Sequence, residues 1–320
     1  MRSPIAAAAF AVAIAAPGAA VAQTDLLIGS TSASSSHYGY FVAVSQVINN
    51  QVEGVSTSVA ETGATLDNLR RLARDQVDIG LVTTNVLYSA YNGLGDFEGN
   101  PLDAQLLWVY SIAPQNAVVR ADSGITELAD LEGQEFNPGI RGSATEATTE
   151  RVFAELGVAP AWVRGSTGDM VDAVKDARIV GYVKSGAGLA LDASTLDIAT
   201  STEINILGLT DEQAAAIAEA LPELSIVEVP ANSGQGTEAY QTWAFAVGAA
   251  ATSNLDEETA YQIVKAIMED DEFQRSAMAS VGDLDLAETT LEYATTPLHP
   301  GTIRYLTEQG YDIPERLIAD

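Results

Sequence analysis

The chain has 320 residues, of which 47% are apolar, and its 15 basic and 44 acidic residues give a formal charge of −29. Such a charge argues against nucleic acid or an anionic membrane as a partner, and the absence of cysteine excludes disulfides, thiolate chemistry and cysteine-based metal sites. This length and apolar content usually give two domains.

The N-terminal segment, residues 1–22, has the composition of a secretory signal. Arg2 supplies a positive start, residues 5–16 are apolar, and Ala20-Val21-Ala22 is a small-residue cleavage site. The apolar run is too short to cross a bilayer. We expect a mature protein that begins near Gln23 and is soluble in a bacterial periplasm, neither embedded in the membrane nor lipid-anchored.

The next hundred residues alternate strands with helices. Apolar runs predict strands at 26–29, 55–60 and 77–83, and apolar residues at helical spacing predict helices at 38–50 and 66–74. This βαβαβ order predicts an α/β fold with a parallel sheet and right-handed crossovers.

The same alternation begins again after residue 112. Further strands are expected at 106–112, 118–119, 134–136, 162–163, 179–183, 225–229 and 242–247. Further helices are expected at 125–131, between Ser143 and Gly157, around 170–174, and at 211–221 and 256–269. Without a low-complexity linker, the domains should be joined by strands crossing near 112–118 and 227–242. The expected division is domain 1 from 23–112 and 230–320, and domain 2 from 113–229.

The segment from Gln134 to Gly157 reads as strand, loop and helix. Ser143 and Glu146 fit a capping box at the start of the helix. A helix N-terminus favours an anion, and Arg141 adds a two-point donor for a carboxylate. A capped surface helix with a solvated arginine is the alternative that this segment alone leaves open.

Loops rich in Gly, Ser and Thr recur where predicted strands end and helices begin. They occupy residues 30–37, 62–65, 137–143 and 165–168. Ligands of open α/β sheets bind outside the carboxyl ends of the strands. Two domains facing each other are therefore expected to form a cleft lined by helix N-termini, which suits a small anion.

The sequence carries none of the common catalytic or phosphate-binding motifs. Only His37 and His299 have imidazoles that could act as bases near neutral pH. His299, between two prolines, is expected to start a helix, whereas for His37 ligand contact and helix capping both stay open. Carboxylates show no metal-ligand spacing, so we expect no enzyme, no metal and no cofactor.

An ordered set of short motifs extends from Ile28 to about Gly310. These are Ile28-Gly29-Ser30 with His37-Tyr38 and Ile48-Asn49, Thr62–Leu69, Asp78–Val82, Tyr88–Gly93, Asp122–Ile125 with Asp130–Gly133, Gly139 with Gly142–Glu146, and Pro297–Gly301 with Tyr305. Through this set, the mature chain resembles the TAXI class of solute-binding proteins, which serve tripartite ATP-independent periplasmic (TRAP) transporters.

The resemblance implies a type II periplasmic-binding-protein fold, with two doubly wound α/β domains around a central ligand cleft. It also implies hinge closure on an acidic or amino-acid-like solute, such as glutamate or 2-oxoglutarate, and delivery to TRAP-type membrane permease subunits. The sequence departs from the family pattern at residues 32–35, His37, Asn85 and Arg141. These added side chains predict a narrower and more specific pocket.

We expect Arg141 to pair the ligand carboxylate with help from Ser143, Tyr38 to pack on the ligand, and Lys184 and Asn85 to add polar contacts. The full predicted set is Ser30, Ser36, His37, Tyr38, Thr62, Ala64, Asn85, Arg141, Gly142, Ser143, Thr145 and Lys184. An extracytoplasmic ligand-sensing protein for a membrane receptor is the alternative function that the sequence leaves open.

Overall fold

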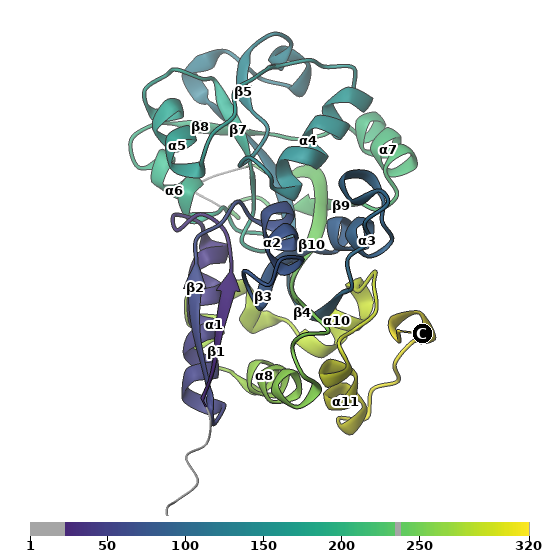
Figure 1. Ribbon diagram of the computed structural model, residues 1–320. Helices are drawn as coiled ribbons and strands as arrows, with labels where there is room; N and C mark the ends of the chain where they lie inside the picture. Colours follow the sequence, from purple (N-terminus) through teal and green to yellow (C-terminus); the bar gives the residue numbers. More distant parts are fainter. Residues whose placement is uncertain (1–22, 234–237, 320) are drawn as a thin grey trace, which may run out of the picture.

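The computed structural model describes residues 23–233 and 238–319, so the predicted signal segment 1–22 lies outside the described residues (Figure 1). The strands are β1 (Thr24–Gly29), β2 (Val55–Ala60), β3 (Ile79–Thr83), β4 (Ala104–Arg120), β5 (Glu135–Asn137), β6 (Ala161–Trp162), β7 (Gly181–Ser185), β8 (Ile204–Leu207), β9 (Ser225–Val229) and β10 (Tyr240–Thr252). They form one continuous path in the order β2-β1-β3-β10-β4-β7-β5-β6, with β8 paired to β4 and β9 paired to β10.

The α-helices are α1 (Ser36–Gln51), α2 (Thr65–Leu72), α3 (Thr84–Tyr91), α4 (Ala144–Glu155), α5 (Thr167–Lys175), α6 (Ala193–Ala199), α7 (Asp211–Ala220), α8 (Glu257–Glu269), α9 (Phe273–Ala277), α10 (Leu286–Tyr293) and α11 (Pro300–Glu308). Short 3-10 helices η1 to η5 occupy Gly95–Phe97, Ala121–Ser123, Leu128–Leu131, Ala279–Asp283 and Glu315–Leu317. Among the helices that Figure 1 labels, α1, α8 and α11 lie in its lower half and α4 to α7 in its upper half.

We call β1–β3 with α1–α3 and α8–α11 lobe 1, and β5–β8 with α4–α7 lobe 2. In each lobe the pairs expected from the βαβ order are parallel, as in β1 with β2 and β5 with β7. The strands that connect the lobes, β4 and β10, are antiparallel to each other. The α/β prediction is therefore confirmed, and the antiparallel centre is an addition to it.

The strands expected separately at 106–112 and 118–119 are one strand, β4, of 17 residues. Its first part pairs with β10 as far as Ala113, and from Gln115 onward it pairs with β7. Pro114, which cannot donate a ladder hydrogen bond, lies between the two paired parts. β4 therefore passes from one lobe into the other without interruption.

The expected helix at 125–131 is wrong in extent, because only the 3-10 helix Leu128–Leu131 forms there. The Asp130 carboxylate accepts the backbone N–H groups of Thr126 and Glu127, which holds the preceding residues in a turn. Helix α6 and strand β8 had no counterpart in the predicted elements.

A column of buried aromatic side chains connects the core of lobe 1 to the carboxyl ends of its strands. Trp108 Nε1 donates to Tyr40 Oη at 2.9 Å, and Tyr40 Oη donates to Gln274 Oε1 at 2.7 Å. The Tyr40 ring stacks on Tyr110 with centroids 3.8 Å apart. Because each polar tip in the column is hydrogen-bonded, the rings are fixed in both position and orientation.

Gly248 of β10 provides the first testable prediction, because a Cβ there would lie 2.3 Å from the Trp108 carbonyl oxygen. The backbone of β4 must move to admit it, so we expect Gly248→Ala to lower the free energy of unfolding by about 3 kcal/mol. Urea denaturation measures this.

The matched control is Gly39→Ala in helix α1, where an added Cβ has nothing within 4 Å. That change should leave stability unchanged or raise it by about 0.5–1 kcal/mol, because alanine is the better helix former. Equal effects of the two substitutions would contradict the predicted clash.

Candidate functional site

The carboxyl ends of strands from both lobes meet around a cavity of about 40 Å³. This volume holds about three water molecules, far less than the several hundred Å³ of a typical ligand site. The lobes are therefore closed on each other. The cavity is lined by Thr31, His37, Ala64, Thr65, Leu81, Thr83, Ile140, Ser143, Ala144, Thr145, Lys184, Ser185, Phe245 and Val247.

Four helices begin at this cavity. Its lining includes His37 from the first turn of α1, Thr65 from α2, Thr83 at the N-cap of α3 and Ala144 from α4. The four positive helix ends converge on one small space, so the cavity favours a negatively charged group. Thr83 Oγ1 is buried and has no hydrogen-bond partner among the described residues.

The cap of α4 is partly as expected. Ser143 Oγ accepts the Glu146 N–H at 3.1 Å, which confirms Ser143 as the N-cap. The return bond of the predicted capping box is wrong, because the Ser143 N–H donates to the Ile140 carbonyl. Glu146 Oε2 instead accepts the Gly142 N–H at 2.6 Å.

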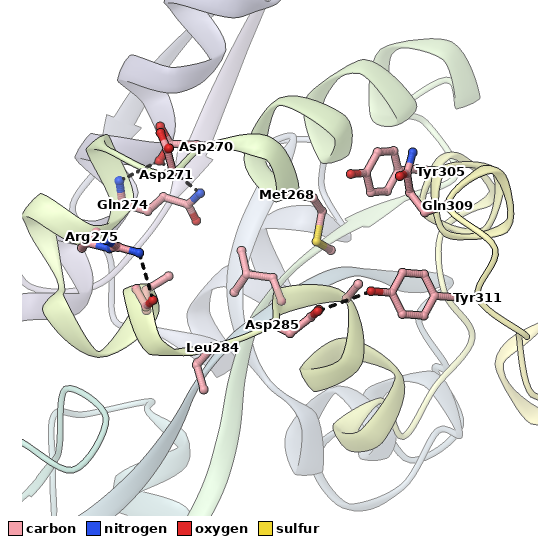
Figure 2. A pocket seen from close by; sticks show the side chains of 14 residues that line it. Met268, Asp270, Asp271, Gln274, Arg275, Leu284, Asp285, Tyr305, Gln309 and Tyr311 are labelled. Carbon is pink, nitrogen blue, oxygen red and sulfur yellow. Dashed lines mark hydrogen bonds between the residues drawn. The ribbon is translucent and has the colours of Figure 1, made fainter.

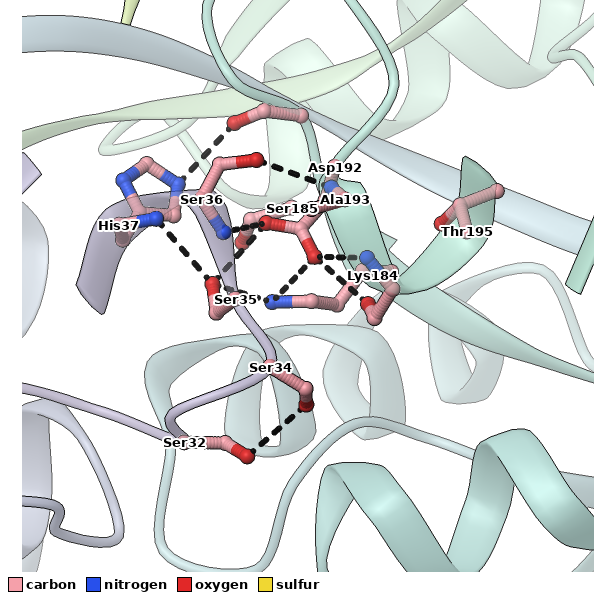
Figure 3. A network of polar contacts seen from close by, with 12 residues as sticks. Ser32, Ser34, Ser35, Ser36, His37, Lys184, Ser185, Asp192, Ala193 and Thr195 are labelled. Carbon is pink, nitrogen blue, oxygen red and sulfur yellow. Dashed lines mark hydrogen bonds and ion pairs between the residues drawn. The ribbon is translucent and has the colours of Figure 1, made fainter. Parts of the chain in front are cut away.

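A buried carboxylate joins the lobes beside the cavity (Figure 3). Asp192, just before α6 in lobe 2, accepts hydrogen bonds from Ser35 Oγ at 2.9 Å and from the Ser36 N–H at 2.8 Å, both in lobe 1. In return, Ser36 Oγ accepts the Ala193 N–H at 2.9 Å. Lys184 Nζ lies 3.6 Å from Asp192 Oδ1 and donates to Ser35 Oγ.

Asp192 stays ionised although it is completely buried. Burial raises its pKa, but the charge of Lys184 and the hydrogen bonds from Ser194 outweigh burial and hold the pKa below its ordinary value. We define this arrangement of Asp192, Lys184, Ser35 and Ser36 as the latch.

His37 is fixed at both ring nitrogens. Its Nε2 donates to the Gly186 carbonyl at 3.1 Å, and in the neutral ring Nδ1 then accepts from Tyr110 Oη at 2.9 Å. Burial, and next the charge of Lys184, lower the pKa of His37 from 6.5 to about 4. The sequence had left ligand contact and capping open for His37. The structure has Ser35 as the cap of α1, while His37 spans the lobes and lines the cavity.

Five of the predicted site residues line the cavity, namely His37, Ala64, Ser143, Thr145 and Lys184. Four others shape its walls through hydrogen bonds. Thr62 Oγ1 donates to the Ser30 carbonyl, Ser36 belongs to the latch, and the Gly142 carbonyl accepts the Leu66 N–H across the lobes. Ser30 itself is buried, and its hydroxyl has no partner in the part of the chain that the structure describes.

The remaining three predicted residues do not line the cavity. Arg141 is exposed, and its backbone oxygen rather than its guanidinium faces Gly63 of lobe 1. Tyr38 is half-buried on α1. Asn85 lines a different hollow between α3 and α4.

The sequence analysis did not identify three apolar residues of the cavity lining, Leu81, Phe245 and Val247. Leu81 and Thr83 could have been found, because they lie at the carboxyl end of a predicted buried strand. Phe245 and Val247 gave no such signal, since only the pairing of β10 with β3 and β4 brings them to the cavity. Asp192 was missed because nothing local distinguishes it from the other acidic residues.

Lobe 1 has a separate hollow of about 380 Å³ among α8–α11, shown in Figure 2. Its polar groups are largely paired with each other, as in Arg275 with the Gly282 carbonyl and Tyr311 with Asp285. Over residues 23–233 and 238–319, the structure shows no cluster of side chains suited to a metal ion and no helix long and apolar enough to cross a membrane.

The fold is that of a periplasmic binding protein. The structure of the periplasmic binding protein BugD superposes with a TM-score of 0.56 at 11% identity, over 89% of this chain and 96% of BugD. The alkanesulfonate-binding protein SsuA from Xanthomonas axonopodis pv. citri, bound to MOPS, gives 0.49 at 15% identity over 91% and 92%. The substrate-binding protein of an amino acid ABC transporter gives 0.47 at 14% over 81% and 97%.

A sequence family also matches nearly the whole described chain. The match covers residues 28–310, from within β1 to two residues beyond α11, and so includes elements of both lobes and every residue of the cavity lining. The protein therefore belongs to the NMT1-like family.

Proposed function

We propose that this protein is a periplasmic solute-binding subunit that captures a small organic anion between its lobes and delivers it to a membrane permease. The observation that supports this most directly is the convergence of four helix N-termini and Lys184 on one closed cavity. Within this proposal, the motif resemblance favours the TAXI class of solute-binding proteins for TRAP transporters, and glutamate and 2-oxoglutarate are the first solutes to test.

Closure by a hinge is the second part of the proposal. We take residues 23–112 and 230–320 as one domain and 113–229 as the other. Both connecting strands change their pairing partner, which supports this division. β4 changes from β10 to β7 around Pro114, and β10 pairs with β9 up to Ala244 and with β4 from Phe245 onward. A bend in these two strands would move the lobes apart, break the latch and open the cavity to solvent.

Binding without catalysis agrees with the state of the two histidines. Both ring nitrogens of His37 are hydrogen-bonded, and His299 caps α11 as predicted, with Nδ1 accepting the Gly301 N–H and Nε2 donating to the Leu255 carbonyl. Neither imidazole is free to take a proton from a substrate in the closed state. The proposal therefore includes no reaction and no cofactor.

Ligand screening tests the function itself. We expect a thermal-shift screen of organic acids and amino acids to raise the melting temperature for a narrow set, because a ligand at 100 times its Kd stabilises the folded state by about 2.7 kcal/mol. Small-angle scattering should then show a smaller radius of gyration with ligand. An unchanged radius at saturating ligand would contradict hinge closure.

Lys184 rather than Arg141 is the cation at the cavity, so the proposed partner of the ligand's anionic group is Lys184. We expect Lys184→Met to weaken binding by about 2–5 kcal/mol, roughly 30-fold or more, because it removes a buried partner of the anion. Arg141→Ala should bind within about twofold of wild type. Calorimetry measures both affinities, and circular dichroism checks folding.

A larger loss of affinity in Arg141→Ala than in Lys184→Met would instead make Arg141 the partner of the anionic group, as the sequence predicted. Lys184→Arg serves as the conservative control: it keeps the charge beside Asp192 and should restore part of the lost affinity.

Acid should also weaken binding through His37. Its pKa is about 4 in the closed state, and in an open, hydrated cleft it should lie near 6.5. Closure then requires a neutral ring, so affinity is fully present above pH 6.5 and declines as the pH falls toward 4. Between pH 7 and pH 5 we expect a loss of about twentyfold.

The matched variant for the pH series is His37→Gln, whose amide can still donate to Gly186 but does not titrate in this range. Its affinity should change little between pH 7 and pH 5. If the affinity of His37→Gln falls with pH as steeply as that of wild type, the pH dependence comes from another group.

A further inference from the structure

A groove of about 480 Å³ lies beside the cavity, between α3 and η1 of lobe 1 and α4 of lobe 2. Figure 1 shows α3 below α4 on the same side of the molecule. Its walls are mainly apolar and include Leu66, Val86, Leu94, Phe97 and Ala147. Leu94 is 47% exposed, which is unusual for a large apolar side chain in the described part of this protein.

The groove and the cavity share no lining residue, but three helices contribute to both. Each of α2, α3 and α4 lines the cavity at its N-terminal end and lines the groove with residues that follow directly. The pairs are Thr65 with Leu66, Thr83 with Asn85, and Thr145 with Ala147 and Thr148. The groove therefore begins within one helical turn of the cavity on each of these helices.

Asn85 is the groove residue of α3 closest in sequence to Thr83. It is only 7% exposed, and its Oδ1 has no hydrogen-bond partner among the described residues. An unpaired buried amide oxygen is costly. A donor supplied by an occupant of the groove would remove this cost.

The charged groups at the rim of the groove are already paired. Arg151 Nη1 lies 2.5 Å from Glu223 Oε1, and Asp96 lies 3.5 Å from Arg70. A second charged group on the occupant would find no unpaired opposite charge among these residues. An apolar body fits the walls better.

We propose that the groove is part of the solute site, and that the solute is an aliphatic monocarboxylic acid with a hydroxyl group near its carboxylate. The carboxylate binds at the cavity, the hydroxyl donates to Asn85 Oδ1, and the aliphatic chain lies between α3 and α4. This inference rests on the proposed function, since it extends the same site. It also favours such acids over glutamate and 2-oxoglutarate, which carry a second charged group.

A calorimetric series of straight-chain acids from acetate to octanoate tests the groove. In wild type, each methylene group buried in it should tighten binding about fourfold. Ala147→Phe fills the groove and should abolish this gain for longer acids. Ala154→Phe, on the exposed part of the same helix and outside the groove, is the matched control and should retain the gain.

The hydroxyl is tested with the 2-hydroxy and 3-hydroxy derivatives of the acid that binds best. One of them should bind about fivefold more tightly than the unsubstituted acid, and Asn85→Leu should remove that preference. The leucine variant should fold with at least wild-type stability, because it removes an unpaired buried oxygen.

Failure of the inference and failure of the proposed function are distinguishable. Affinity independent of chain length, or a gain that survives in Ala147→Phe, overturns the groove as part of the site. If short acids or dicarboxylates still bind and Lys184→Met still weakens their binding, the proposed function stands without the groove. If no organic anion of any length binds wild type, both are overturned.

Discussion

The closed arrangement of this protein depends on one buried carboxylate. Asp192 has no exposed surface, and two of its hydrogen-bond donors, Ser35 and the Ser36 N–H, belong to the opposite lobe. A carboxylate is stable in such a place only when donors and a cation surround it. The hydrogen bonds from Ser35 and Ser36 to Asp192 therefore form only when the lobes are closed. When the lobes separate, water must replace these lobe 1 donors.

The latch is connected to the core through His37. The ring accepts a hydrogen bond from Tyr110, which stacks on Tyr40, which in turn is held by Trp108 and Gln274. On its other side, the ring donates to the Gly186 carbonyl of the segment that follows β7. Rigid packing in lobe 1 thus fixes the position of a neutral imidazole that spans the cleft, so closure, protonation and ligand binding are coupled in the proposed function.

The shape of the site narrows the solutes that suit it. The cavity offers converging helix ends, the hydroxyl of Thr83, which has no partner among the described residues, and one lysine that already neutralises Asp192. Such a site stabilises a single negative group better than two. The adjoining groove has apolar walls and paired charges at its rim, which is the physical basis for proposing a monocarboxylate with an aliphatic body.

The sequence by itself determined the α/β class, most strands and helices, the Ser143 and His299 caps and the recurrence of hydroxyl-rich loops at strand ends. These features depend on local periodicity and on hydrogen bonds between near neighbours, which are visible along the chain. Tertiary structure alone decided that β4 is continuous, that Phe245 and Val247 reach the cavity, and that Lys184 rather than Arg141 faces it. Those outcomes depend on strand pairing and on the contact between lobes, which bring together residues separated by more than a hundred positions, such as Ser35 and Asp192.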